Sequence, residues 1–116
     1  DIAEIITYLS DRSAANEQLM REMANAAIKM VTDSVDAYVK HDTIMAEKVI
    51  AADDVVDAYF DRVKHQLIER IAADPTDGEY ALDLLMIAKY FERIADHAVN
   101  IAEWVIFSVT GVHKED

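Results

Sequence analysis

The chain of 116 residues has no cysteine, one proline and two glycines, and each scarcity narrows the structures that it can form. Without cysteine it has no disulfide framework, no thiolate metal site and no cysteine nucleophile. Few prolines and glycines beside many alanines, valines, isoleucines, leucines and methionines favour long, rarely interrupted helices. The sequence also has no signal-peptide pattern, and its apolar runs fall far short of the roughly 20 residues of a membrane span. We therefore expect a cytoplasmic protein that does not insert into membranes.

Positive charge is also scarce, because 11 lysines and arginines face 23 aspartates and glutamates. The resulting formal charge of −12 repels nucleic acid, anionic lipid and free phosphate. It attracts cations or a basic partner surface. The composition thus argues against nucleic-acid binding and in favour of cation or protein binding.

Apolar side chains recur at helical spacing in three segments, roughly residues 17–40, 42–73 and 77–110. The core-facing positions are Met20, Met23, Ala27, Met30, Val31, Ser34 and Tyr38 in the first, Met45, Val49, Ala52, Val56, Phe60, Val63, Leu67 and Ile71 in the second, and Phe91, Ala95, Ala98, Ala102, Val105 and Val109 in the third. Three long amphipathic helices joined by short turns predict an all-α fold, an antiparallel up-down-up three-helix bundle.

The predicted helix ends carry recognisable signals. Asp42 is placed to cap the second helix. Thr76 with Glu79 three residues later forms a possible capping box at the start of the third helix. Gly111 is suited to end that helix, because glycine adopts the left-handed conformation found just past helix ends.

Acidic side chains form stripes on the second and third predicted helices. Asp53 and Asp57 are four residues apart, and Glu92, Asp96 and Asn100 continue at the same spacing, so each set lies on one helix face. In an antiparallel hairpin, positions at equal distances from the turn lie at the same height. Asp57 should therefore lie level with Glu92, and Asp53 level with Asp96.

Two interpretations of these stripes remain open on spacing alone. Clustered carboxylates with an asparagine carbonyl suit hard cations such as Mg²⁺, Mn²⁺ or Fe³⁺. Alternatively, the stripes form a solvated anionic surface that nearby basic residues neutralise, and the candidates for this role are Arg62, Lys64, Lys89 and Arg93.

Catalytic patterns are absent from the sequence. It has no Gly-rich phosphate loop and no HExxH helix. His97 follows Asp96 directly, about 100° round the helix, and so should face away from the acidic stripe. We therefore expect no catalytic residues and no enzyme activity. The alternative is a metal-dependent hydrolase that uses two carboxylate-bound ions about 4 Å apart.

The first eight residues, DIAEIITY, resemble residues 100–107, NIAEWVIF. If the match is a true repeat, residues 1–12 are the remnant of the last helix of a preceding repeat plus a linker, and residues 13–116 form a three-helix domain. Short Ile-Ala-Glu strings are common in helices, which is the alternative explanation. The start at Asp1 without methionine agrees with an excised or processed fragment.

The segment FERIADHAVNIAEWVIFSVTG resembles the last-helix signature of the PhoU family, and VIAADDVVDAYFDRV resembles its preceding helix. The resemblance implies half of a protein with two tandem, spectrin-repeat-like three-helix units. It also implies that acidic-x-x-x-acidic motifs bind iron or zinc, with manganese and magnesium as other candidates. The matching metal ligands are Asp53, Asp57, Glu92 and Asp96, and Asn100 extends the second motif.

The same resemblance implies a function and partners. PhoU proteins negatively regulate phosphate uptake and phosphate-starvation signalling, between a phosphate ABC transporter and a sensor histidine kinase. A homodimer is the implied assembly. A soluble appendage of a phosphate or ion transporter is an alternative. The departure from the family pattern is the missing first repeat, on which any function that needs two metal patches would depend.

Overall fold

A computed structural model describes residues 14–111 of the chain, and side chains from Gln18 onwards. It contains three long α-helices, α2 (Ala14–Lys40), α3 (Thr43–Ala73) and α4 (Gly78–Thr110), and one short 3₁₀ helix, η1 (Pro75–Asp77). These bounds match the three helices predicted from apolar periodicity. The predicted repeat remnant at residues 1–12 lies outside the described residues.

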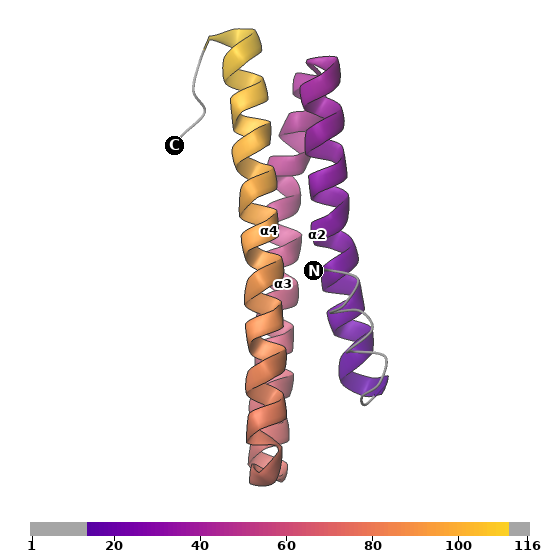
Figure 1. Ribbon diagram of the computed structural model, residues 1–116, viewed down its shortest axis with the longest axis vertical. Coiled ribbons are helices and arrows are strands. Elements are labelled where there is room, and N and C mark those ends of the chain that lie inside the picture. The colour runs from indigo at the N-terminus through magenta and orange to yellow at the C-terminus, as the bar shows by residue number, and fades with distance from the viewer. Residues whose placement is uncertain (1–13, 112–116) are drawn as a thin grey trace.

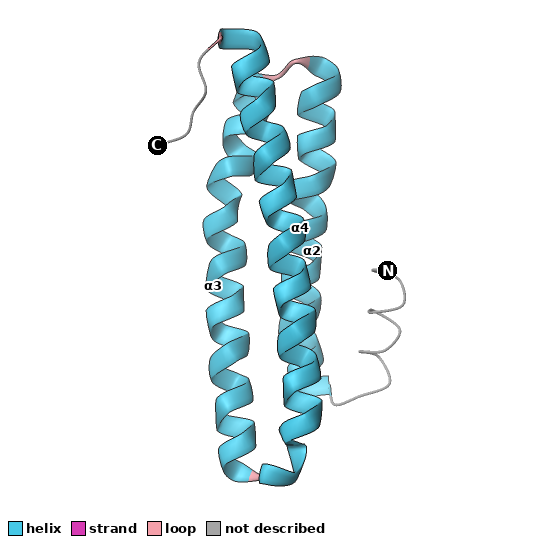
Figure 2. Cartoon of the chain, turned by 60° about the vertical axis from the view of Figure 1, so that its left-hand side comes forward, coloured by secondary structure: helices cyan, strands magenta, loops and turns pink. Residues whose placement is uncertain are grey.

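The three helices run up, down and up in one antiparallel bundle (Figures 1 and 2). The described residues contain no β-strand, so the predicted all-α class is confirmed. None of these helices is both long and apolar enough to cross a lipid bilayer.

Two of the predicted helix ends are confirmed. The Asp42 carboxylate accepts a 3.0 Å hydrogen bond from the Met45 backbone N–H, which would otherwise lack a partner in the first turn of α3. At the C-terminal end of α4, Gly111 has φ +75° and donates its N–H to the Phe107 carbonyl at 2.7 Å. Each end depends on the chemistry of one residue, which explains why the sequence predicted both.

The predicted capping box at Thr76 and Glu79 is wrong. The Asp74 carboxylate instead accepts hydrogen bonds from the Thr76 backbone N–H at 3.1 Å and from its hydroxyl at 2.6 Å. Thr76 therefore lies within η1, and the N-cap position of α4 is Asp77, which makes no side-chain cap bond. Asp77 instead accepts a 2.9 Å hydrogen bond from Arg70 at the end of α3.

The core lies along the axis between the three helices. Its largest fully buried side chains are Phe91, Met20, Met23, Met30 and Leu84. Helix α4 contributes a row of buried alanines, which are Ala81, Ala88, Ala95, Ala98 and Ala102. Small side chains at this spacing let the helix backbones approach closely, while methionine fills the irregular gaps that remain.

Three residues predicted in the core are exposed, namely Tyr38, Ile71 and Val109. Tyr38 lies beside the buried row of α2, which continues through Ser34 and Ala37, and Val109 lies in the last turn of α4. Ile71 lies near the α3–α4 turn, and the described part of α2 stops short of that turn (Figures 1 and 2). The pattern of α3 predicted a buried face there, but Ile71 is 39% exposed.

Candidate cation-binding site

The four predicted carboxylates lie along the outer groove between α3 and α4, which we call the α3–α4 face. Asp53 and Glu92 are half-buried and come from α3 and α4 respectively, while Asp57 and Asp96 are exposed one turn further along the same helices. Asn100 is exposed one turn beyond Asp96. The equal rise of antiparallel helices brings the acidic stripes to one level, as predicted.

Electrostatics show that the carboxylates of the two helices act on one another. Burial raises the pKa of the Asp53 carboxyl above its usual value of 3.8, and the negative charges of Asp57, Asp96, Asp54 and Glu92 raise it further, in that order. Two of these four groups belong to α4. Asp96 acts more strongly than Glu92, which agrees with the predicted level of Asp53 with Asp96. We call Asp53, Asp57, Glu92 and Asp96 the carboxylate cluster.

The carboxylate cluster is not a ready-made metal cage. Within the part of the chain that the structure describes, no three histidine, aspartate or glutamate side chains come together as a group that could hold a metal ion. His97, which is exposed beside Asp96, does not change this. The oxygen donors suit a hard cation, which commonly retains bound water when protein ligands are few.

Basic side chains neutralise only part of the cluster. Lys89 donates a 3.2 Å hydrogen bond to Glu92, and its ammonium group also lies 4.6 Å from the centroid of the Phe60 ring. Among the described residues, no ion pair joins Asp53, Asp57 or Asp96 to a lysine or arginine. The alternative of a fully neutralised surface therefore holds for Glu92 alone.

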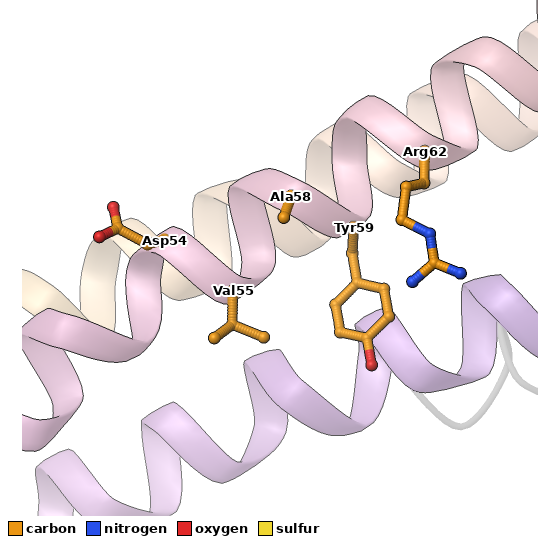
Figure 3. A pocket seen from close by; sticks show the side chains of 5 residues that line it. All are labelled: Asp54, Val55, Ala58, Tyr59 and Arg62. Atoms are coloured by element: carbon orange, nitrogen blue, oxygen red, sulfur yellow. The ribbon is translucent and has the colours of Figure 1, made fainter.

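Arg62, another predicted neutralising residue, lies on a different side of α3. Its guanidinium carbon is 5.7 Å from the centroid of the Tyr59 ring, and the Tyr59 hydroxyl donates a 3.3 Å hydrogen bond to Glu22 of α2. Asp54, Val55 and Ala58 line a cavity of about 360 Å³ together with these two α3 residues (Figure 3). Figure 3 shows the Tyr59 ring and the Arg62 guanidinium directed towards α2.

The sequence prediction missed an apolar groove on the same α3–α4 face, next to the hairpin turn. This groove has a volume of about 270 Å³ and an almost wholly apolar lining, made by Lys64, Leu67, Ile68, Ile71, Gly78, Ala81, Leu82 and Leu85. A signal for it was available, because the apolar stripes of both helices continue to the turn. The sequence did not reveal that these side chains would line an open groove.

Comparison with known proteins identifies the family. Residues 20–105 match the PhoU domain. The chain is 32% identical over 118 residues to a Thermotoga maritima protein and 32% identical over 114 residues to a Clostridium acetobutylicum protein. It is 34% identical over 109 residues to a Caulobacter vibrioides protein.

These alignments cover 100%, 96% and 94% of the chain but only 51%, 51% and 47% of the three relatives, so the chain spans about half the length of each. All three are named as homologues of the phosphate-specific transport system accessory protein PhoU. The chain therefore belongs to the PhoU family.

Proposed function

We propose that the chain is a regulatory module of a phosphate transport system and acts by binding a cation and protein partners. Its family membership and the accessory role named for its relatives support this class of function. The strongest observation on the chain itself is the convergence on Asp53 of negative charge from two helices. Such a concentration of carboxylates, of which Glu92 pairs with Lys89, disfavours the free protein and favours one with a bound cation.

The proposed cation ligands are the carboxylate cluster, with Asn100 as a further oxygen donor. All of these donors are oxygens, which suits magnesium, manganese or iron better than zinc, because zinc sites usually include nitrogen or sulfur ligands. A bound cation would offset part of the negative charge of this face and could bridge it to a phosphate or an anionic partner. The two helices fix the positions of the four carboxylates, and the ion pair with Lys89 orients the side chain of Glu92.

The proposed partners are components of a phosphate ABC transporter and a sensor histidine kinase, met in the cytoplasm. The module would restrain phosphate uptake and starvation signalling through these contacts, either alone or as a homodimer. Because the chain spans about half of its relatives, each of these roles belongs to the proposal. The relatives are named as accessory proteins of transport, and we assign the chain no catalytic step.

Cation affinity tests the proposal most directly. Isothermal titration calorimetry with Mn²⁺, Mg²⁺ and Zn²⁺, together with the iron content of the purified protein, would compare the parent with an Asp57→Asn, Asp96→Asn double variant. The control is Asp36→Asn, Glu69→Gln, which removes the same two charges from α2 and from α3 outside the carboxylate cluster. We expect the parent and the control to bind Mn²⁺ at least tenfold more tightly than the double variant.

Three results would oppose the proposal in different ways. Equal affinity in the parent and the double variant would show that the cluster is only solvated surface. Equal losses in the control would show that net charge, and not the cluster, attracts the cation. A phosphatase activity that disappears in the double variant would replace the regulatory module by the metal-dependent hydrolase.

A further inference from the structure

The apolar groove carries an unusual amount of exposed hydrophobic surface for so charged a protein. Leu82 of α4 is 57% exposed, and Ile68 across the groove on α3 is 55% exposed. Contiguous exposed patches of this kind mark interaction sites more often than they occur by chance.

The apolar groove and the carboxylate cluster form one continuous surface. On α4 the stripe runs through Leu82, Leu85, Lys89, Glu92 and Asp96, with spacings of three, four, three and four residues. This spacing places all five side chains on one side of the helix. The α3–α4 face thus changes along its length from apolar at the turn, through Lys89, to acidic.

Helix α3 shows the same change from apolar to acidic side chains along its length. Ile71 and Ile68 lie nearest the turn, Lys64 comes next, and Asp57 and Asp53 lie furthest from it. The two helices therefore present matching bands of side chains across the groove. From Leu82 to Asp96 the surface extends over about 21 Å, at 1.5 Å per residue.

We propose that the α3–α4 face is the docking site for an amphipathic helix of a partner protein, with large apolar side chains at one end and lysines or arginines at the other. The apolar end would fill the groove beside Leu82, and the basic end would pair with the carboxylate cluster. The proposal rests on the proposed function in one respect, namely that the module works through a protein partner. It does not require a bound metal.

Charge complementarity favours such a helix over a second copy of this chain. The α3–α4 face offers Lys64 and Lys89 as its own cations, and Lys89 is already bound to Glu92. A second copy would bring few basic groups to the carboxylates, and both copies would carry a formal charge of −12. A basic amphipathic helix satisfies both bands at once, as is usual for helix-in-groove recognition.

The test uses a synthetic helical peptide about 18 residues long, with leucines along one face of its first half and lysines along the same face of its second half. Binding to the full chain is measured by fluorescence anisotropy at low and high salt, with EDTA present. The groove variant is Ile68→Asn, Leu82→Asn, and the matched control is Val39→Asn, which alters an exposed apolar residue at the other end of the bundle. Circular dichroism confirms that each variant is folded.

We expect the groove variant to bind the peptide at least tenfold more weakly than the parent and the control. The Asp57→Asn, Asp96→Asn variant should bind several-fold more weakly and lose much of the salt dependence. A peptide with glutamates in place of the lysines should not bind measurably. The groove variant should keep the Mn²⁺ affinity of the parent, which separates this proposal from the cation site.

Several outcomes would overturn the docking proposal. One is unchanged peptide binding by the groove variant, and another is an equal loss in the Val39→Asn control. Equal binding of the glutamate peptide would show that the carboxylates do not select a basic partner. If sedimentation shows a dimer of the parent that the groove variant dissociates, the occupant is a second copy of the chain and not a partner helix.

Discussion

The two ends of the α3–α4 face lie on the same pair of helices but differ in chemistry, because one is acidic and the other is apolar. At the carboxylate cluster, burial and then the neighbouring negative charges raise the pKa of Asp53. At the apolar groove, large side chains such as Leu82 remain in water. A positively charged partner would stabilise the carboxylate cluster, and an apolar partner would stabilise the apolar groove.

This difference shows that the bundle separates stability from recognition. Its stability comes from the buried side, where α2 covers α3 and α4 and packs alanines and methionines tightly. The side that faces away from α2 is free to carry side chains that do not favour folding. Variants on the buried side should therefore unfold both ends together, and variants on the outer face should change binding with little effect on stability.

The largest expected effect comes from Phe91→Ala. Phe91 is fully buried behind the junction of the two ends, and loss of such an aromatic side chain costs about 3–5 kcal/mol of unfolding free energy. We expect urea transitions followed by far-UV circular dichroism and by fluorescence of the single tryptophan to shift together. Tyr90→Ala, at the exposed neighbouring position, is the control and should cost much less. Separate transitions in Phe91→Ala would show that the two ends fold independently.

A smaller effect is expected for Arg70→Ala, which acts at the apolar end alone. The Arg70 side chain donates a 2.9 Å hydrogen bond to Asp77, and its guanidinium carbon lies 4.8 Å from the centroid of the Tyr80 ring. A partly exposed ion pair and a cation–π contact together contribute about 1–2 kcal/mol. The urea midpoint should fall accordingly, while Arg93→Ala, an exposed arginine of α4, should leave it nearly unchanged. An equal fall for both would mean that Arg70 acts only through net charge.

Much of this architecture could be predicted from the sequence because periodicity and single-residue caps are local properties. The helices α2, α3 and α4, the Asp42 cap and the Gly111 end all follow from side chains within one or two turns. The levels of the acidic stripes also followed, since they need only the rise per residue and one turn position. The fold class therefore required no long-range information.

The incorrect predictions share a physical cause. The sequence allows competing interactions and does not show which of them is the more favourable. Thr76 has an acidic residue on either side in the sequence, Asp74 and Glu79. It pairs with Asp74, because a separation of two residues suits an Asx-type turn before α4 begins. The exposure of Ile71 depends on where α2 starts relative to the turn, which is a property of the assembled bundle. Likewise, spacing placed the carboxylates on one face but did not determine whether their oxygens converge on a single point.

The subtlest expected effect concerns Asp53→Asn, because it should stabilise the metal-free protein. Aspartate and asparagine have similar helix propensities, so the change mainly removes charge from the carboxylate cluster. Loss of a like-charge neighbour four residues from Asp57 contributes about 0.2–0.5 kcal/mol, and repulsion from Asp96 adds to this. We expect a gain of about 0.5 kcal/mol in the free energy of unfolding at neutral pH, measured by urea denaturation in EDTA.

The pH dependence gives this gain a distinctive signature. Since folding raises the pKa of Asp53, the native state holds its proton more tightly than the unfolded state does between the usual value of 3.8 and the raised value. The contribution of Asp53 to stability therefore falls as the pH rises through that interval, and it is constant above it. Asp53→Asn should match the parent below pH 3.8 and become the more stable protein above that interval. Asp54→Asn removes the same charge from an exposed neighbouring position and should gain less, so equal gains would assign the effect to overall charge and not to the cluster.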